Sequence, residues 1–93
     1  MVSRYAIKSI MLRGSYSKEE TALREILRAS RKSLGLRQAD LALRLGMPQS
    51  FVSKYESGER LLTFVEVLVI MEALSLNIET VMKNITSANE TKS

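Results

Sequence analysis

The first helix that the apolar pattern predicts covers residues 18 to 34. Ser17 and Glu20 have the spacing of a capping box, in which the serine side chain accepts from the glutamate amide and the glutamate reaches back. One helical face then carries apolar side chains at spacings of three, four and seven residues, namely Leu23, Ile26, Leu27 and Leu34. Gly35 supplies a left-handed residue that ends the helix.

Two short helices are predicted next, over residues 37–45 and 48–57, joined by a tight turn. Gly46 permits a positive φ, and Pro48 suits a first helical turn, where an N–H is not needed. Arg37 occupies the usual N-cap position and cannot accept a hydrogen bond, so we expect a poorly capped start. Gln38 is then expected to be free to offer its amide outward.

The second of these helices has a polar face without any large apolar residue. It consists of Gln49, Ser50, Ser53, Lys54 and Ser57. An amide, hydroxyls and an ammonium group are what base edges and phosphates accept, although such a stripe is more often only a solvated helix face. Phe51 borders this face and either packs against Tyr55 or touches a thymine methyl group.

The segment after this pair is apolar on all sides. Thr63 and Glu66 form a second capping box, and a helix is expected from residue 63 to about 74. A helix that is apolar all round must be buried all round, which a small monomer cannot easily achieve. We therefore expect a dimer interface on this helix, at Phe64, Val65, Val69 and Ile70. A fifth helix, capped by Asn77, is expected to end near Ile85.

The two ends carry weaker signals, and they divide the chain into residues 1–16, 17–85 and 86–93. The N-terminal arm is apolar without a clean period, so strand, arm and helix extension stay open, as does a frayed end. Such an arm could pack on the other subunit. The C-terminal tail has almost no apolar content, and we expect it to be disordered.

The composition excludes several classes of function. The 93 residues contain no cysteine and no histidine, so the usual zinc ligands and the commonest general base are missing. We expect no enzyme activity, no catalytic residue, no cofactor and no metal. No apolar run approaches the roughly 20 residues that span a bilayer, and the N-terminus is too interrupted by charge for a secretory signal. A soluble, cytoplasmic protein is expected.

The charge distribution is uneven. Residues 1–60 carry twelve Lys/Arg and six Asp/Glu, a net +6, whereas residues 61–93 carry two and four, a net −2. A basic N-terminal part and an acidic C-terminal part are typical of a protein that binds a polyanion on one side. An ordinary solvated surface accounts for this charge distribution equally well.

The central stretch resembles the lambda-repressor-like (Cro/XRE) helix-turn-helix family. The residues that carry the resemblance are Gln38, Ala39, Asp40, Leu41, Ala42, Leu45, Gly46 and the run from Gln49 to Gly58. The resemblance covers about residues 23 to 85. It implies an all-α, five-helix DNA-binding domain in which the third helix, residues 48–57, enters the major groove of double-stranded DNA.

The resemblance also implies roles for single residues. Base-edge contacts would come from Gln49, Ser50 and Lys54. Gln38 would meet a phosphate and brace the first residue of the recognition helix, while further backbone contacts would come from Ser53, Ser57 and Arg60. Arg37 departs from the family pattern and adds a charge near the phosphates. Arg31 and Glu56 would form a buried ion pair between the first and third helices.

Two functions follow from these features. The first is a sequence-specific transcriptional regulator of bacterial or phage origin, expected to be a repressor, that acts as a homodimer on a palindromic operator and associates with the nucleoid through DNA binding. The second is an antitoxin or a control protein of a phage or mobile element, whose arm or tail binds a protein partner. The two can coexist.

Overall fold

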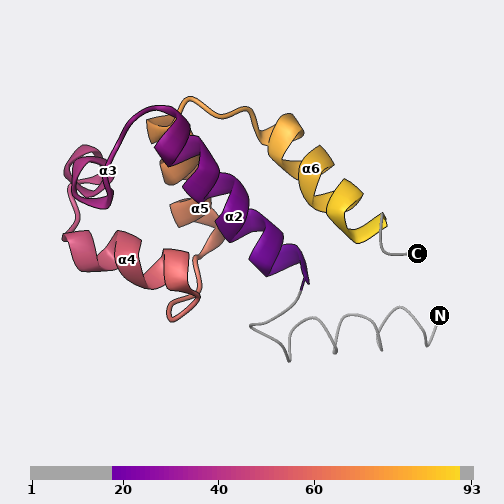
Figure 1. The fold of residues 1–93 in the computed structure, drawn as a ribbon, viewed down its shortest axis with the longest axis horizontal. Coiled ribbons are helices and arrows are strands. Elements are labelled where there is room, and N and C mark those ends of the chain that lie inside the picture. The colour runs from indigo at the N-terminus through magenta and orange to yellow at the C-terminus, as the bar shows by residue number, and fades with distance from the viewer. Residues whose placement is uncertain (1–17, 91–93) are drawn as a thin grey trace.

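The computed structural model describes residues 18–90, with side chains through residue 85. Within these residues the chain folds into five α-helices and no strand, which confirms the all-α prediction. The helices are α2 (Lys18–Ser33), α3 (Gln38–Leu45), α4 (Gln49–Ser57), α5 (Phe64–Ala73) and α6 (Ile78–Glu90). In Figure 1, α2 runs through the middle of the molecule, with α3 and α4 to its left and α6 to its right.

The helix starts follow the local chemistry of their caps. The capping box at α5 is confirmed, because Thr63 Oγ1 accepts from the Glu66 N–H at 3.1 Å and a Glu66 oxygen accepts from the Thr63 N–H at 2.9 Å. The start of α3 is better capped than expected. Asp40, three residues into the helix, accepts from the Arg37 N–H at 2.8 Å and so supplies half of a capping box. The box expected at Ser17 lies outside the described residues.

One apolar core holds the helices together. Its fully buried side chains are Leu27 from α2, Leu41 from α3, Val52 and Tyr55 from α4 and Ile70 from α5. Helix α2 packs against α4 and α6, while α3 packs against α4 and α5. This places α4 on a rigid base made by α2 and α3, with its other face turned outward.

Helix α5 is buried on one side only. Phe64, Val65 and Val69 are 70%, 65% and 47% exposed, so the single chain leaves half of this apolar helix uncovered. The sequence pattern placed Ile70 at the dimer interface, and this prediction is wrong. Ile70 is 1% exposed and belongs to the core of its own chain, where no partner could reach it.

The C-terminal helix is longer than expected. It continues to Glu90 rather than ending near Ile85, so residues 86–90 belong to α6 and not to a disordered tail. Residues 91–93 and residues 1–17, which include the N-terminal arm, lie outside the described residues. Among the described residues, each helix is too short or too polar to cross a bilayer.

Candidate nucleic-acid interface

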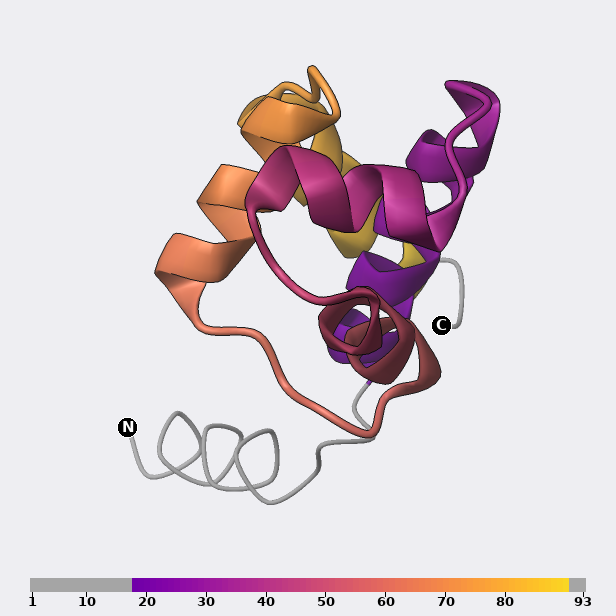
Figure 2. The same cartoon turned by 90° about the vertical axis from the view of Figure 1, so that its left-hand side faces the viewer.

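A tight turn sets the angle between α3 and α4. Gly46 has a φ of +68° and ends α3, and the Met47 N–H then donates to the Ala42 carbonyl at 2.9 Å. Pro48 has an extended backbone and serves as the N-cap of α4, so this helix begins one residue later than expected. Figure 2 shows α3 passing above α4, with this turn joining them. The two helices form a helix-turn-helix pair.

The outer face of α4 presents the polar side chains expected from the sequence. Gln49, Ser50 and Lys54 are exposed, and Ser53 is half-buried. In the described residues, Ser50, Ser53 and Lys54 make no side-chain hydrogen bond, so their donors and acceptors face solvent. This outer face is therefore available to a ligand that offers hydrogen-bonding edges.

A buried ion pair anchors α4 to α2. Arg31 Nε donates to one Glu56 oxygen at 2.7 Å and Arg31 Nη2 to the other at 3.0 Å, while both side chains are less than a tenth exposed. Arg31 Nη1 also donates to the Leu36 carbonyl at 2.8 Å. The hydrogen bond to Glu56 raises the pKa of the Arg31 guanidinium above its ordinary value. The pair thus ties α2, α4 and the loop before α3 at one point.

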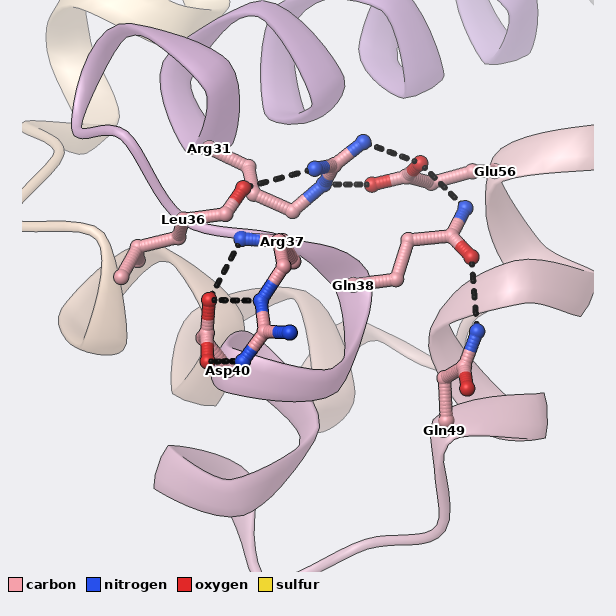
Figure 3. Close-up of polar contacts among 7 residues, drawn as sticks. All are labelled: Arg31, Leu36, Arg37, Gln38, Asp40, Gln49 and Glu56. Carbon is pink, nitrogen blue, oxygen red and sulfur yellow. Dashed lines mark hydrogen bonds and ion pairs between the residues drawn. The ribbon is translucent and has the colours of Figure 1, made fainter.

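This ion pair continues into a chain of amide hydrogen bonds that ends on the outer face. Gln38 Nε2 donates to Glu56 Oε1 at 3.0 Å, and Gln49 Nε2 donates to Gln38 Oε1 at 3.3 Å. Figure 3 shows the chain running from Arg31 on α2 to Gln49 at the start of α4. The sequence suggested that the Gln38 amide is free to face outward. Instead, both its nitrogen and its oxygen are hydrogen-bonded inside the domain, which leaves its second N–H as the donor that could face outward.

The two arginines expected to contact the DNA backbone both have acidic partners. The Arg37 guanidinium donates to both Asp40 oxygens, at 3.0 and 2.9 Å, and lowers the pKa of that carboxyl to about 2. Arg60 donates to both Glu66 oxygens at 2.9 Å, and this hydrogen bonding lowers the pKa of Glu66 to about 2. Each guanidinium would thus approach a phosphate with its charge already partly offset.

Phe51 packs inside the domain. It is 7% exposed, and its ring meets that of Tyr55 edge-on at a centroid distance of 5.5 Å. The Arg60 guanidinium carbon lies 4.8 Å from the centre of the Phe51 ring, within the range of a cation–π contact. The alternative of a thymine methyl contact is thereby removed, since the ring does not reach the outer face.

The acidic partners of these arginines were not recognised in the sequence as ion-pair residues. Asp40 lies three positions after Arg37, a spacing at which helical side chains meet, so the sequence did contain that signal. Glu66 was recognised only as part of a capping box. Ser57 is also bonded locally, since its hydroxyl donates to the Lys54 carbonyl and accepts from the Glu59 N–H.

An apolar groove lies beside α4, between the helix-turn-helix turn and the open face of α5. Its volume is about 150 Å³, and it is lined by Leu45, Met47, Phe51, Val65, Glu66, Val69 and Ile70. In the part of the chain that the structure describes, no group of three or more acidic side chains is placed to hold a metal ion.

The comparisons agree with this geometry. The Helix-turn-helix family model matches residues 27–81, which is more than half of the chain. A solved structure described as "XRE-family like protein from Pseudomonas syringae pv. tomato str. DC3000" is similar to the chain with a TM-score of 0.72 and 32% identity. The similarity covers 88% of this chain and 94% of that one. No curated protein matches the sequence.

Proposed function

The chain belongs to the XRE-like helix-turn-helix family of DNA-binding regulators, and from this premise we propose that it is a sequence-specific transcriptional regulator. In this proposal α4 lies in the major groove of double-stranded DNA, which is wide enough to admit an α-helix. The observation that carries it is the outer face of α4, where Ser50, Ser53 and Lys54 have no partner in the described residues.

The side chains divide into base readers and backbone contacts. Gln49, Ser50 and Lys54 read base edges: an amide suits adenine and an ammonium suits guanine or a phosphate. The backbone contacts are Arg37, Gln38, Ser53, Ser57 and Arg60. The acidic partners of the two arginines remain in place, so we expect each arginine to add less to the salt dependence of binding than a free cation would.

We place the dimer interface on the exposed side of α5, at Phe64, Val65 and Val69, with Leu68 between them. These four side chains form one helical face and are 37–70% exposed. A two-fold dimer would set two recognition helices about 34 Å apart, one turn of DNA, and so read a palindrome. Such a dimer, bound across a bacterial or phage promoter, would block transcription and so act as a repressor. It would be found in the cytoplasm, associated with the nucleoid through its DNA binding.

A second candidate function is binding of a protein partner, as an antitoxin or a control protein of a phage or mobile element. The apolar groove beside α4 favours it, because an apolar side chain of a partner would bury the exposed parts of Met47 and Val65. The arm and the final residues, which the sequence suggested as partner-binding segments, lie outside the described residues.

Selection from random duplex DNA at two salt concentrations tests the main proposal. We expect an inverted repeat with half-site centres about ten base pairs apart. Lys54→Ala should change the selected bases, whereas Lys83→Ala removes the same charge from α6 and should leave them unchanged. Binding without any enriched sequence, lost steeply as salt rises, would mean attachment to phosphates alone and would refute a sequence-reading role.

The dimer is tested separately by light scattering. Val69→Glu places a charge on the α5 face and should yield monomers, while Leu34→Glu, at an equally exposed apolar residue in the turn after α2, should not. If both variants and the unmodified protein are monomers at all concentrations, the palindromic dimer is withdrawn. Partner capture through the groove would then become the leading proposal.

A further inference from the structure

In the series of hydrogen bonds that ends at Gln49, the chemistry of each side chain fixes which atom donates and which accepts. The series begins at Arg31, whose guanidinium can only donate, and passes through the Glu56 carboxylate, which can only accept. Glu56 Oε1 accepts from both Arg31 Nη2 and Gln38 Nε2, at 3.0 Å each. Gln38 Oε1 then accepts from Gln49 Nε2 at 3.3 Å. Three helices, α2, α4 and α3, contribute to this chain (Figure 3).

The direction follows from the chemistry of the two ends. A carboxylate offers no proton, so the Gln38 atom that faces Glu56 must be the amide nitrogen. The other end of the Gln38 amide, its carbonyl oxygen, therefore faces Gln49. A carbonyl oxygen can only accept, so Gln49 must turn its own amide nitrogen toward Gln38. Glu56 thus dictates the orientation of two amides, although it does not touch the second one.

This orientation decides which atoms Gln49 presents to a base. One amide N–H is used by Gln38, and the carbonyl oxygen and the second N–H remain for DNA. Adenine offers the matching pair in the major groove, an N6 donor beside an N7 acceptor, whereas guanine offers two acceptors. A flipped amide would meet adenine with its donor and acceptor exchanged.

We propose that Glu56 is a positioning residue that makes Gln49 specific for adenine by holding the Gln38 and Gln49 amides in one orientation. The inference rests on the proposed function, because it requires that Gln49 meets a base edge. It goes beyond that function in assigning the base preference to a carboxylate that lies inside the domain and belongs to its structural ion pair.

Glu56→Gln tests the direction of the chain. With the amide oxygen of the new glutamine on the shorter bond to Arg31 Nε, 2.7 Å in the unmodified protein, its nitrogen would take the place of Oε1, lose the bond from Arg31 Nη2 and face Gln38. Gln38 would turn its oxygen toward that nitrogen, and Gln49 would in turn direct its oxygen inward. Both N–H groups of Gln49 would then face the groove, a pattern that suits the two acceptors of guanine.

The measurement uses the duplex that the unmodified protein selects, with the base pair read by Gln49 changed from A·T to G·C. We expect the unmodified protein to prefer adenine by about tenfold, as a good bidentate contact does. Glu56→Gln should reduce this ratio to about one or invert it. Gln38→Met, which breaks the chain but leaves the ion pair intact, should lower the adenine preference without creating one for guanine.

Substitution of unmodified purine, which lacks the N6 amino group of adenine, at the same position gives an independent readout. Loss of the N6 donor should weaken binding of the unmodified protein several-fold and leave Glu56→Gln nearly unaffected, because Gln49 in that variant would present two N–H groups and no acceptor. A purely structural role for Glu56 would lower the affinity for all of these duplexes equally. Circular dichroism verifies that each variant is folded, and if Glu56→Gln does not fold, Gln38→Met decides alone.

Unchanged adenine-to-guanine ratios in the folded variants would overturn the inference while leaving the regulator proposal intact. Failure of the proposed function itself would give a different result. If the unmodified protein selects no sequence, or if Gln49→Ala alters no base preference, then base reading by Gln49 fails first and the inference fails with it.

Discussion

The buried ion pair gives the sharpest stability prediction. Arg31→Met keeps a long apolar side chain on α2 but removes three donors, two to Glu56 and one to the Leu36 carbonyl. The Glu56 carboxylate, only 3% exposed, would then retain Gln38 as its remaining hydrogen-bond donor among the described residues.

The expected loss is large compared with the stability of a small domain. Breaking a buried pair by removing one partner costs about 3–5 kcal/mol, since it leaves a charge that is neither hydrated nor neutralised. A domain of this size is stable by about 5–15 kcal/mol in total. Arg31→Met should therefore retain only a fraction of the folding free energy and could begin to unfold near room temperature.

Urea unfolding followed by circular dichroism measures this loss. With a slope of about 1–2 kcal/mol per molar urea, the midpoint should fall by about 2 M or more. Arg31→Met/Glu56→Met removes both charges and should recover most of the loss, because a well-packed apolar pair often matches a buried ion pair in stability. A midpoint shift below about 0.5 M for the single variant, or no recovery in the double variant, would refute the reasoning.

Three further predictions concern the caps and the exposed ion pairs. Gly58→Ala should lower the free energy of unfolding, measured in urea, by about 1–2 kcal/mol or more, because φ is +86° and the new Cβ would lie 3.0 Å from a guanidinium carbon on α2. Gly35→Ala is the control: φ is +73° and the space around it is open, so only the unfavourable backbone conformation should lower the stability. Thr63→Ala removes the α5 cap and should cost about 1 kcal/mol, measured as a lower melting temperature, with an unchanged value counting against the cap. The folded pKa values of Asp40 and Glu66, about 2, lie below their ordinary values of 3.8 and 4.5, so both carboxylates stabilise the fold at neutral pH. The stabilisation by these carboxylates should be lost as the pH falls from about 4.5 toward 2, and it should weaken in high salt. If a Glu66→Gln variant loses as much stability in acid as the unmodified protein does, Glu66 does not contribute to this pH dependence.

The positions of the helices could be predicted because local signals decide them. Gly35, Gly46 and Gly58 each stand at a positive φ between helices, and the Thr63 box marks the start of α5. The end of α6 was predicted too early because the stretch after Ile85 contains no large apolar residue. That stretch also lacks glycine and proline, so nothing in it breaks a helix.

The inward face of α5 could not be predicted from its pattern. Nearly every position from Phe64 to Met71 is apolar, so periodicity gives no phase to the helix. Packing against α3 chooses the phase, and it turns Ile70 and Met71 inward while Phe64 and Val65 face out. The assignment of Ile70 to an interface failed for this reason.

The partners of long charged side chains also required the structure. Arg60 could extend toward a phosphate, toward Glu66 or over a ring, and its sequence neighbourhood does not choose among these. The segment after α4 folds back so that Arg60 meets both Glu66, in the first turn of α5, and Phe51, in the first turn of α4. The ion pair of Arg31 and Glu56 was foreseen only through the family resemblance, because 25 positions separate the two residues.

The side chains on the outer face of α4 differ in how strongly they are tied to the scaffold. Gln49 ends a chain of contacts that reaches the buried centre, so replacing it removes the hydrogen bond that Gln38 Oε1 accepts. Ser50 and Lys54 have no such ties within the described residues, and they can be exchanged without cost to folding. Under the proposed function, redesign of this protein for a new operator should therefore begin at positions 50 and 54. Position 49 should be changed only together with position 38, as one unit of recognition.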